Sequence, residues 1–340
     1  MKKYKILAPV LAASLLLLCG CRASTPAIGL SPNWNKDTTR EPDGTDFSPI
    51  EELSYDVTFE SNAQSAYGVQ YETGTYTTKL ECRIIHEAEP AQLGYAYTTQ
   101  LKLTGYFTIN GEKSPETFED VLTSEVLFLR RDKALQPVKS VKKGNSHTPV
   151  GTSPKSFEEN YFWEIADYVY EVNYNNPLTE ATINLSYRDR YSTQTEFREY
   201  KAEPQTTAVT ATNFFDNEQI LFVLRGYNMA GAVSLKTLDP ASYKTQATVN
   251  ITAPSAVSRV VDFTIDENGS ERKIEEAIDT YETTMMLSAG MSGQARLLVY
   301  AARTQTYQND YRNVLIYQEV PYFSNLGTMK YSLKTAKFYS

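Results

Sequence analysis

Histidine and cysteine are scarce in this chain, with two histidines and three cysteines among its 340 residues. His86 and His147 are each isolated in the sequence, which excludes a metal site built from several histidines and disfavours a His-dependent catalytic triad. The sequence also lacks the spacing of a calcium-binding loop, a glycine loop that cradles phosphate and a dinucleotide-binding fingerprint. We therefore predict no bound metal and no cofactor.

Catalytic motifs are also missing. The segment Gly290-Met291-Ser292-Gly293-Gln294 lacks the final glycine of a nucleophile elbow, and its position between two expected strands is typical of a turn. The Ser-x-x-Lys match that begins at Ser140 has no Lys-Thr-Gly or Ser-Asp-Asn companion, so we predict no catalytic residue from motifs. A carboxylate-based glycan hydrolase stays open, because its two acids need no fixed spacing and the chain has 41 acidic residues. We expect the adjacent acid pairs to lie at helix starts and turn edges: Glu158-Glu159, Asp266-Glu267 and Glu275-Glu276.

One apolar run stands near the N-terminus, where Ile6–Leu18 follows three lysines. The run is about 13 residues long, which is short for a segment that crosses a bilayer. It ends in Leu18-Cys19-Gly20-Cys21, and this sequence resembles the lipobox of bacterial lipoprotein signal peptides. The resemblance implies removal of residues 1–20 as a signal peptide and attachment of a diacylglyceryl group to the Cys21 sulfur.

The expected location follows from that lipid. Two acyl chains, such as palmitate, hold a protein stably on a membrane, whereas one chain binds only marginally. The resemblance therefore implies a protein anchored at the extracytoplasmic face of the cell membrane. The alternative is an ordinary secretory signal that leaves a free exported protein.

The chain that remains after this cleavage has one cysteine besides Cys21, namely Cys82, so we expect no intramolecular disulfide. Leu80, Cys82 and Ile84 alternate along one expected strand face, which favours a buried and inert thiol. Thirty basic and 41 acidic side chains remain, a net charge of −11, which disfavours nucleic acid as a partner. Residues 21–50 are rich in proline, serine, threonine, asparagine and aspartate, and we expect a flexible tether there.

Period-two alternation of apolar residues begins after residue 50 and predicts strands throughout residues 51–340. Asn110-Gly111 and Asn268-Gly269 follow such runs and predict tight hairpin turns. No fixed-period repeat is visible, which disfavours propellers and solenoids. We predict an all-β domain, one large antiparallel sheet or two packed halves. The clearest alternating sets are Leu101-Leu103-Gly105-Phe107-Ile109, Tyr168-Tyr170-Val172-Tyr174 and Val261-Phe263-Ile265.

Helices are expected at two places only. Asp216 and Gln219 have the spacing of a capping box, which predicts a helix from Asp216 to about Arg225 that ends at Gly226. A second helix is expected after Ser156.

The body of the chain resembles a group of uncharacterised exported bacterial proteins. The resemblance rests on Ala134-Leu135-Gln136-Pro137-Val138, on the segment Asp216–Gln219 and on Tyr317-Gln318-Glu319-Val320-Pro321. It implies an unclosed, strongly curved β-barrel like that of lipoprotein carriers, and it brings no catalytic residues. In such a fold the concave side of the sheet is the natural site for a hydrophobic or amphipathic ligand.

Tyrosine is abundant, with 25 tyrosines against 14 phenylalanines. Trp163, Tyr168, Tyr170 and Tyr174 form the densest local cluster and are our candidate ligand-binding residues, for a glycan or a lipid-like molecule. Tyrosine also suits half-exposed strand surfaces in general, and we give this second interpretation more weight. Three functions remain: a surface-tethered binding or carrier lipoprotein, a structural or interaction protein of the envelope, and the glycan hydrolase.

Overall fold

The computed structural model describes residues 47–61, 68–130, 135–149, 163–191, 194–210, 212–226, 231–240, 243–287, 295–302, 313–322 and 327–339. Cys21, the expected tether up to residue 46 and the expected helix after Ser156 lie outside these ranges. Most of the described chain is strand, as predicted for an all-β protein. The strands are β1 Phe47–Ser61, β2 Gly68–Ile85, β3 Gln92–Ile109, β4 Glu112–Leu129, β5 Pro137–Pro149, β6 Trp163–Tyr174, β7 Glu180–Tyr191, β8 Arg198–Lys201, β9 Gln205–Ala208, β10 Val233–Leu238, β11 Gln246–Ile251, β12 Ser255–Glu267, β13 Ser270–Leu287, β14 Ala295–Ala301, β15 Leu315–Tyr322 and β16 Gly327–Phe338.

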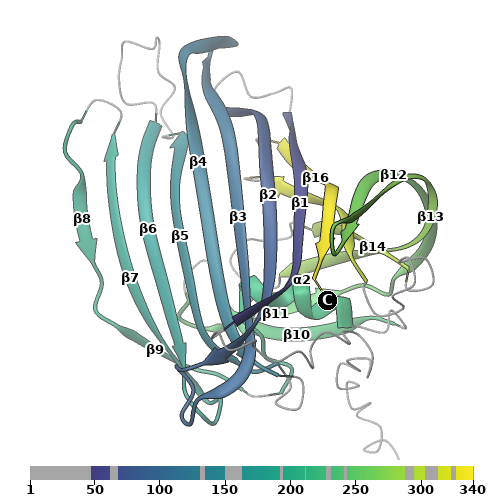
Figure 1. Ribbon diagram of the computed structural model, residues 1–340. Coiled ribbons are helices and arrows are strands. Elements are labelled where there is room, and N and C mark those ends of the chain that lie inside the picture. Colours follow the sequence, from purple (N-terminus) through teal and green to yellow (C-terminus); the bar gives the residue numbers. More distant parts are fainter. Residues whose placement is uncertain are drawn as a thin grey trace, which may run out of the picture.

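One continuous sheet contains all of these strands. Its order is β10-β11-β13-β14-β15-β16-β1-β2-β3-β4-β5-β6-β7-β8, with β9 paired to β7 and β12 paired to β13 and β16. Figure 1 shows β1 to β8 side by side as one tall curved layer, with β10 and β11 crossing near its lower end. The end strands β8 and β10 are not neighbours in this order, so the large sheet is curved and unclosed.

A short segment between β9 and the helix spans the gap between the two ends of the sheet. On one side, the Val209 amide donates to the Thr179 carbonyl at 2.8 Å, beside β7. On the other side, the Phe215 amide donates to the Lys236 carbonyl at 2.9 Å, on β10. Backbone hydrogen bonds of a few residues therefore replace the strand ladder that would have closed the barrel.

Five strands form a smaller closed ring within the sheet. Strands β12, β13, β14, β15 and β16 pair in this order, and β12 returns to β16 through a parallel ladder at Thr264–Glu267 and Thr335–Phe338. Strand β16 serves both parts, because Gly327–Ser332 pair with β15, Thr335–Phe338 pair with β12, and the opposite edge pairs with β1. The ring is therefore attached to the large curved sheet through a shared strand.

Two hairpins confirm the turns predicted from Asn-Gly pairs. Asn110 and Gly111 have φ values of 53° and 82° and join β3 to β4, and Asn268 and Gly269 have 56° and 85° and join β12 to β13. Positive φ at both central residues gives a turn whose twist matches that of the strands, and asparagine and glycine adopt it at the lowest cost. These turns fix the registers of the long antiparallel pairs β3–β4 and β12–β13.

The helix predicted at Asp216 is present, and its capping box is confirmed. A 3₁₀ turn at Asn217–Gln219, α2 at Ile220–Val223 and a second 3₁₀ turn at Leu224–Gly226 follow one another. The Asp216 side chain accepts from the Glu218 amide at 2.9 Å, and the Asp216 amide donates to Gln219 Oε1 at 3.0 Å. No helix in the described ranges has the length and apolar character needed to cross a membrane.

This helix packs against the concave face of the sheet and supplies much of its core. Phe222 is fully buried, and its ring lies 5.4 Å from that of Tyr97 and 5.5 Å from that of Phe128, centroid to centroid. Tyr97 and Phe128 belong to β3 and β4, whose alternation points these side chains to the same face. The helix therefore fills one end of the concave space.

From Leu298 onward, strand β14 is buried on both faces, because one face packs in the core that contains the helix and the other packs inside the ring. Leu298 and Tyr300 pack in the cluster that contains the helix, whereas Val299 and Ala301 pack with Phe263 in the ring. A strand covered on both sides needs a continuous apolar run, and Leu297–Ala302 is such a run.

The first strand begins earlier than predicted. Residues 51–340 were expected to form the domain, yet β1 starts at Phe47, and Ser48 and Ile50 are buried. Phe47–Pro49 pair with Glu81–Arg83 of β2, and this pairing holds the segment in the sheet despite its polar composition. The end of the expected tether is therefore part of the sheet.

A candidate ligand cavity inside the curved sheet

A cavity of about 280 Å³ lies on the concave side of the sheet, next to the helix. Its walls come from nine strands, from the helical segment and from Pro240, so no single segment of the chain forms it. Most of the lining is apolar, with three charged side chains and a few amides and hydroxyls. The lining residues are Tyr76, Thr99, Leu101, Leu122, Thr123, Ser124, Lys142, Asn217, Glu218, Ile220, Leu221, Pro240, Val249, Met285, Leu287, Arg296, Gln318, Val320, Pro321 and Tyr331.

Two packed groups border the cavity along the strands. On β3, Thr99 and Leu101 line it, while Tyr97 on one side packs against the helix and Phe107 on the other packs with Phe118. The same arrangement occurs on β4, where Leu122 lines the cavity between Phe118, which packs with Phe107, and Phe128, which packs against the helix. The cavity therefore occupies the middle of the concave space, between the helix and a group of aromatic side chains.

That aromatic group contains a buried chain of hydrogen bonds. The Tyr71 hydroxyl donates to Asp120 Oδ2 at 2.6 Å and lies 2.9 Å from the Tyr322 hydroxyl. Asp120 Oδ1 also lies 2.6 Å from His147 Nδ1 and accepts from the His147 amide at 3.0 Å. His147 stacks on Phe118 with ring centroids 4.3 Å apart. Asp120, 1% exposed, thus links β4 to β2 and β5, and Tyr71 extends the chain of contacts to Tyr322 of β15.

The charged side chains of the lining include one ion pair. Lys142 Nζ of β5 lies 2.9 Å from Glu218 Oε1 in the first turn of the helical segment. Burial alone would raise the pKa of the Glu218 carboxyl, but the charge and hydrogen bond of Lys142, with smaller contributions from Ser124 and Arg296, hold that pKa below its ordinary value. The charge of Glu218 in turn raises the pKa of Lys142. Both groups are therefore charged at neutral pH and largely neutralise each other.

Two further polar groups of the lining lie on adjacent strands. Gln318 of β15 is 3% exposed, and its Oε1 has no hydrogen-bond partner among the described residues. It pairs in register with Leu298 of β14 and Tyr331 of β16. Arg296 stands two residues before Leu298 on the same face of β14, which places it diagonally across from Gln318. No carboxylate of the described residues lies within ion-pairing distance of Arg296.

The chain is similar to a solved β-barrel-like protein. This is the β-barrel-like protein of the domain of unknown function DUF1849 from Brucella abortus, with a TM-score of 0.45 and 11% sequence identity over 86% of this chain and 98% of that chain. No family model matches the chain, and no curated protein matches it.

The tyrosines proposed from the sequence lie on one face of β6, as their alternation predicted, but they do not line the cavity. Tyr174 is buried, and its hydroxyl donates to Asp216 Oδ2 at 2.6 Å. Tyr170 stacks on Tyr243 with centroids 4.8 Å apart, and Tyr168 stands edge-on to Tyr170 at 5.7 Å. Each of these rings contacts another side chain of the protein, and none of the three is among the residues that line the cavity. The Trp163 side chain, like Cys21, lies outside what the structure describes.

The acidic pairs needed by a hydrolase are not found in this lining. Glu218 is the one acid among the residues that line the cavity, all of which are described, and it is paired with Lys142. Asp216 stands two residues away, but it is 3% exposed and its oxygens accept from Ser140, Tyr174 and the helix backbone. Two carboxylates facing each other across a cleft are what glycoside hydrolysis requires. Within the described residues there is also no cluster of His, Cys, Asp and Glu that could hold a metal ion.

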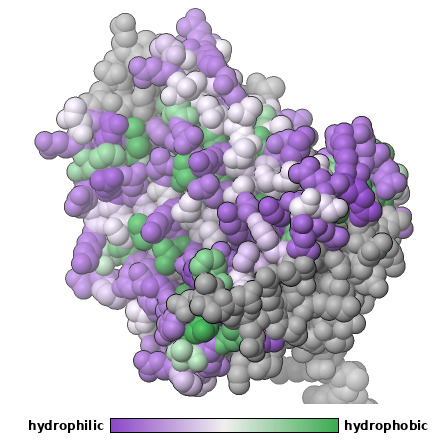
Figure 2. Space-filling model, in the orientation of Figure 1, coloured by the Kyte–Doolittle hydropathy of each residue, from purple (hydrophilic) through white to green (hydrophobic). Residues whose placement is uncertain are grey.

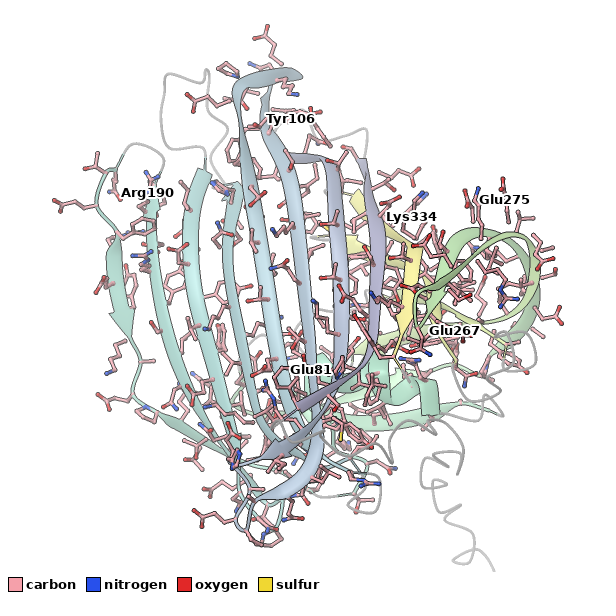
Figure 3. The ribbon with its side chains drawn as sticks, in the orientation of Figure 1. Glu81, Tyr106, Arg190, Glu267, Glu275 and Lys334 are labelled. Atoms are coloured by element: carbon pink, nitrogen blue, oxygen red, sulfur yellow. The ribbon has the colours of Figure 1, made fainter. Side chains whose placement is uncertain are left out.

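The face of the molecule seen in Figure 2 is largely polar. Figure 2 shows hydrophilic residues covering the hairpin of β12 and β13, while hydrophobic residues on the same face are scattered in small groups. In Figure 3 the Glu275 side chain projects away from that hairpin, and Lys334 projects from β16. The apolar side chains that could meet a ligand are therefore gathered inside the curved sheet rather than on this face.

Proposed function

We propose that this protein is a lipid-anchored extracytoplasmic lipoprotein whose curved sheet binds a small hydrophobic or amphipathic ligand. The observation that carries the binding role is the cavity of about 280 Å³ with its mostly apolar lining. Ligand sites in proteins are typically concave, mostly apolar and furnished with a few polar groups that orient the ligand, at roughly 300–1,000 Å³. The cavity is at the small end of this range, which favours one slender molecule or one acyl chain.

An amphipathic ligand fits the lining better than a glycan does. Sugars are usually held by open aromatic faces together with many hydrogen-bonding groups, and this lining has two tyrosines. Both rings are engaged, because Tyr76 and Tyr331 meet edge to face at 5.4 Å. Aliphatic side chains such as Leu101, Leu122 and Val249 make up much of the rest.

A role as a structural protein of the envelope has less support. Such a role calls for a broad exposed apolar patch or sheet edge. The exposed large apolar residues of the described chain lie on four different strands and include Phe47, Tyr200, Val260 and Met286. The cavity, in contrast, is a single continuous feature.

Filling the cavity tests the binding role. Leu122 is half-buried in the wall of the cavity, so the larger side chain of a Leu122→Trp variant should occupy the cavity. The variant should therefore bind an apolar dye less well than the unmodified protein does. Val260→Trp is the matched control, because Val260 is 77% exposed on β12 and is not among the lining residues. Dye fluorescence would be titrated for both variants after circular dichroism has shown that they are folded. Equal dye binding by the two variants would contradict the proposal, and mass spectrometry of lipid extracted with the native protein would identify the occupant.

The lipid anchor has a separate test. A Cys21→Ala variant of the full chain should keep its signal peptide and fail to incorporate radiolabelled palmitate. Cys82→Ala is the matched control, because Cys82 is a buried cysteine of β2 and should leave labelling unchanged. Normal labelling of Cys21→Ala would refute the anchor and leave the cavity unaffected.

A further inference from the structure

We infer that the ligand of this cavity is electrically neutral and carries a hydroxyl group at its polar end. This inference rests on the proposed binding function and specifies the chemical class of the ligand. It is carried by the ion pair between Lys142 and Glu218, which both line the cavity and whose side chains are partly accessible. In this pair a donor and an acceptor of opposite charge lie 2.9 Å apart.

The ion pair belongs to a polar side of the lining. Lys142 of β5 is the direct register partner of Ser124 of β4, and the hydroxyl oxygens of Ser124 and Thr99 lie 2.7 Å apart. Glu218 approaches from the first turn of the helical segment and accepts from Lys142 Nζ. The two hydroxyl residues are buried, whereas the side chains of Lys142 and Glu218 are 30% and 21% exposed. Of these four lining residues, the charged pair is therefore the one that a ligand can reach.

The charges of the pair disfavour a charged ligand. Burial alone would raise the pKa of the Glu218 carboxyl, but Lys142 holds that pKa below its ordinary value, so both groups are charged at neutral pH. An anionic head group beside Lys142 would also meet the Glu218 carboxylate, and a cationic one beside Glu218 would meet the ammonium. Either would lose its hydration in a mostly apolar cavity. Arg296, the third charge of the lining, is an exposed residue whose charge solvent screens.

A hydroxyl group matches both members of the pair. An ammonium has three donors and no acceptor, and a carboxylate only accepts. Within the described ranges the Lys142 ammonium has one acceptor, Glu218, so it has N–H groups to spare. A hydroxyl can accept from Lys142 and donate to Glu218 without separating them. The apolar part of the ligand then lies along aliphatic lining residues such as Leu101 and Leu122.

Four probes with the same ten-carbon chain compare the head groups. They are decan-1-ol, which donates and accepts, decyl methyl ether, which only accepts, decanoate and decylammonium. The protein would be residues 21–340 with a Cys21→Ser change, which carries no lipid and contains every described residue. Calorimetry at neutral pH would give the affinities. We expect decan-1-ol to bind about tenfold tighter than each of the other three.

A variant of the pair connects this preference to its residues. Glu218→Gln keeps the size of the side chain and leaves the charge of Lys142 unbalanced, so decanoate should become the tightest of the four probes. Glu171→Gln is the matched control, because Glu171 pairs with Lys139 at 3.0 Å outside the lining and should leave the order of affinities unchanged. Circular dichroism would show that both variants are folded. The order of the four probes on the unmodified pair decides the inference if Glu218→Gln does not fold.

The other outcomes separate the two proposals. Tightest binding of decanoate or decylammonium without the Glu218 change, or equal binding of the alcohol and the ether, would overturn the inference and uphold an apolar ligand site. A Glu218→Gln variant that loses affinity for all four probes alike would indicate a structural role for the pair and overturn the inference. Failure of every probe to bind would overturn both the inference and the proposed function.

Discussion

Arg225 and Glu51 form a buried ion pair between the end of the helical segment and the first strand. Nη1 and Nη2 of Arg225 lie 2.5 Å and 2.7 Å from the two Glu51 oxygens, and the residues are 174 positions apart in the sequence. The Arg225 Nε donates to the Asn313 carbonyl at 3.1 Å, and Asn313 Nδ2 donates back to the Arg225 carbonyl at 2.7 Å. The pair therefore ties the helix to β1 and to the segment that precedes β15.

Loss of one partner of this pair should be costly, because the other charge would stay buried without compensation. We expect Glu51→Gln to lower the free energy of unfolding by about 3–5 kcal/mol. The neighbouring Glu52 offers a matched control, since its pair with Lys79 spans 3.4 Å at the surface, and Glu52→Gln should cost less than about 1 kcal/mol. Urea denaturation of both variants measures the difference. Equal losses of unfolding free energy in Glu51→Gln and Glu52→Gln would show that burial does not determine how much the Glu51 pair contributes to stability.

Asp216 should tolerate loss of its charge better than loss of its side chain. Burial raises its pKa, and the hydrogen bonds from Ser140, Tyr174 and the Glu218 amide only partly oppose that effect. A raised folded pKa means that the protonated form suits the folded state, so the related stability is present below the unfolded pKa of about 3.8 and is lost as the pH rises through the folded value.

Asn can still accept a hydrogen bond at the helix N-terminus, so Asp216→Asn should be the milder change. Asp216→Ala should cost about 2 kcal/mol or more, because it removes the cap and leaves Ser140 and Tyr174 unpaired. Thermal unfolding at neutral pH would compare them, and a larger loss for Asn than for Ala would contradict this account.

Local features of this fold could be predicted from the sequence. The two Asn-Gly turns need positive φ, and the Asp216 capping box needs only residues three apart, so both follow from nearby positions. Closure of the ring depends instead on β12 meeting β16, with Thr264 beside Thr335, which are 71 positions apart. Nothing in the local pattern of either strand specifies that parallel pairing.

The candidate site could not be predicted for a related reason. Its lining combines residues from Tyr76 to Tyr331, and Lys142 and Glu218 are far apart in the sequence although their side chains meet. The tyrosine hypothesis used local density on β6, yet density on one strand cannot show what packs on that face. Here Tyr243 and Asp216 do so, and both come from beyond β9.

Alkaline pH should unfold this protein cooperatively. Burial raises the pKa of Tyr97 and of Tyr331 to about 12 from an ordinary value of 10.0, and it raises those of Tyr55 and Tyr76 as well. Because the folded state favours the neutral phenol, the stability linked to these groups is fully present below pH 10 and is lost as the pH rises from about 10 through 12. We expect near-ultraviolet absorbance of tyrosinate and loss of far-ultraviolet circular dichroism to appear together in this window. Ionisation of all tyrosines near pH 10 with the fold intact would contradict the buried positions.

We expect only glycine to fit at position 144, because Tyr168 is its direct partner across β5 and β6. A methyl group at Gly144 would lie 2.6 Å from the Cζ and hydroxyl of Tyr168, well inside van der Waals contact. Gly144→Ala should therefore destabilise the protein by about 1–3 kcal/mol, as the ring is forced from its position beside Tyr170.

The effect of Gly144→Ala on stability should change sign when the Tyr168 ring is absent. In a Tyr168→Ala background the added methyl group meets no ring, and alanine in a strand loses less conformational freedom on folding than glycine does. Gly144→Ala should then be neutral or stabilising by roughly 0.5–1 kcal/mol. A double-mutant cycle measured by urea denaturation gives the coupling between the two positions. The same destabilisation in both backgrounds would show that the backbone at residue 144, rather than the tyrosine ring, requires glycine.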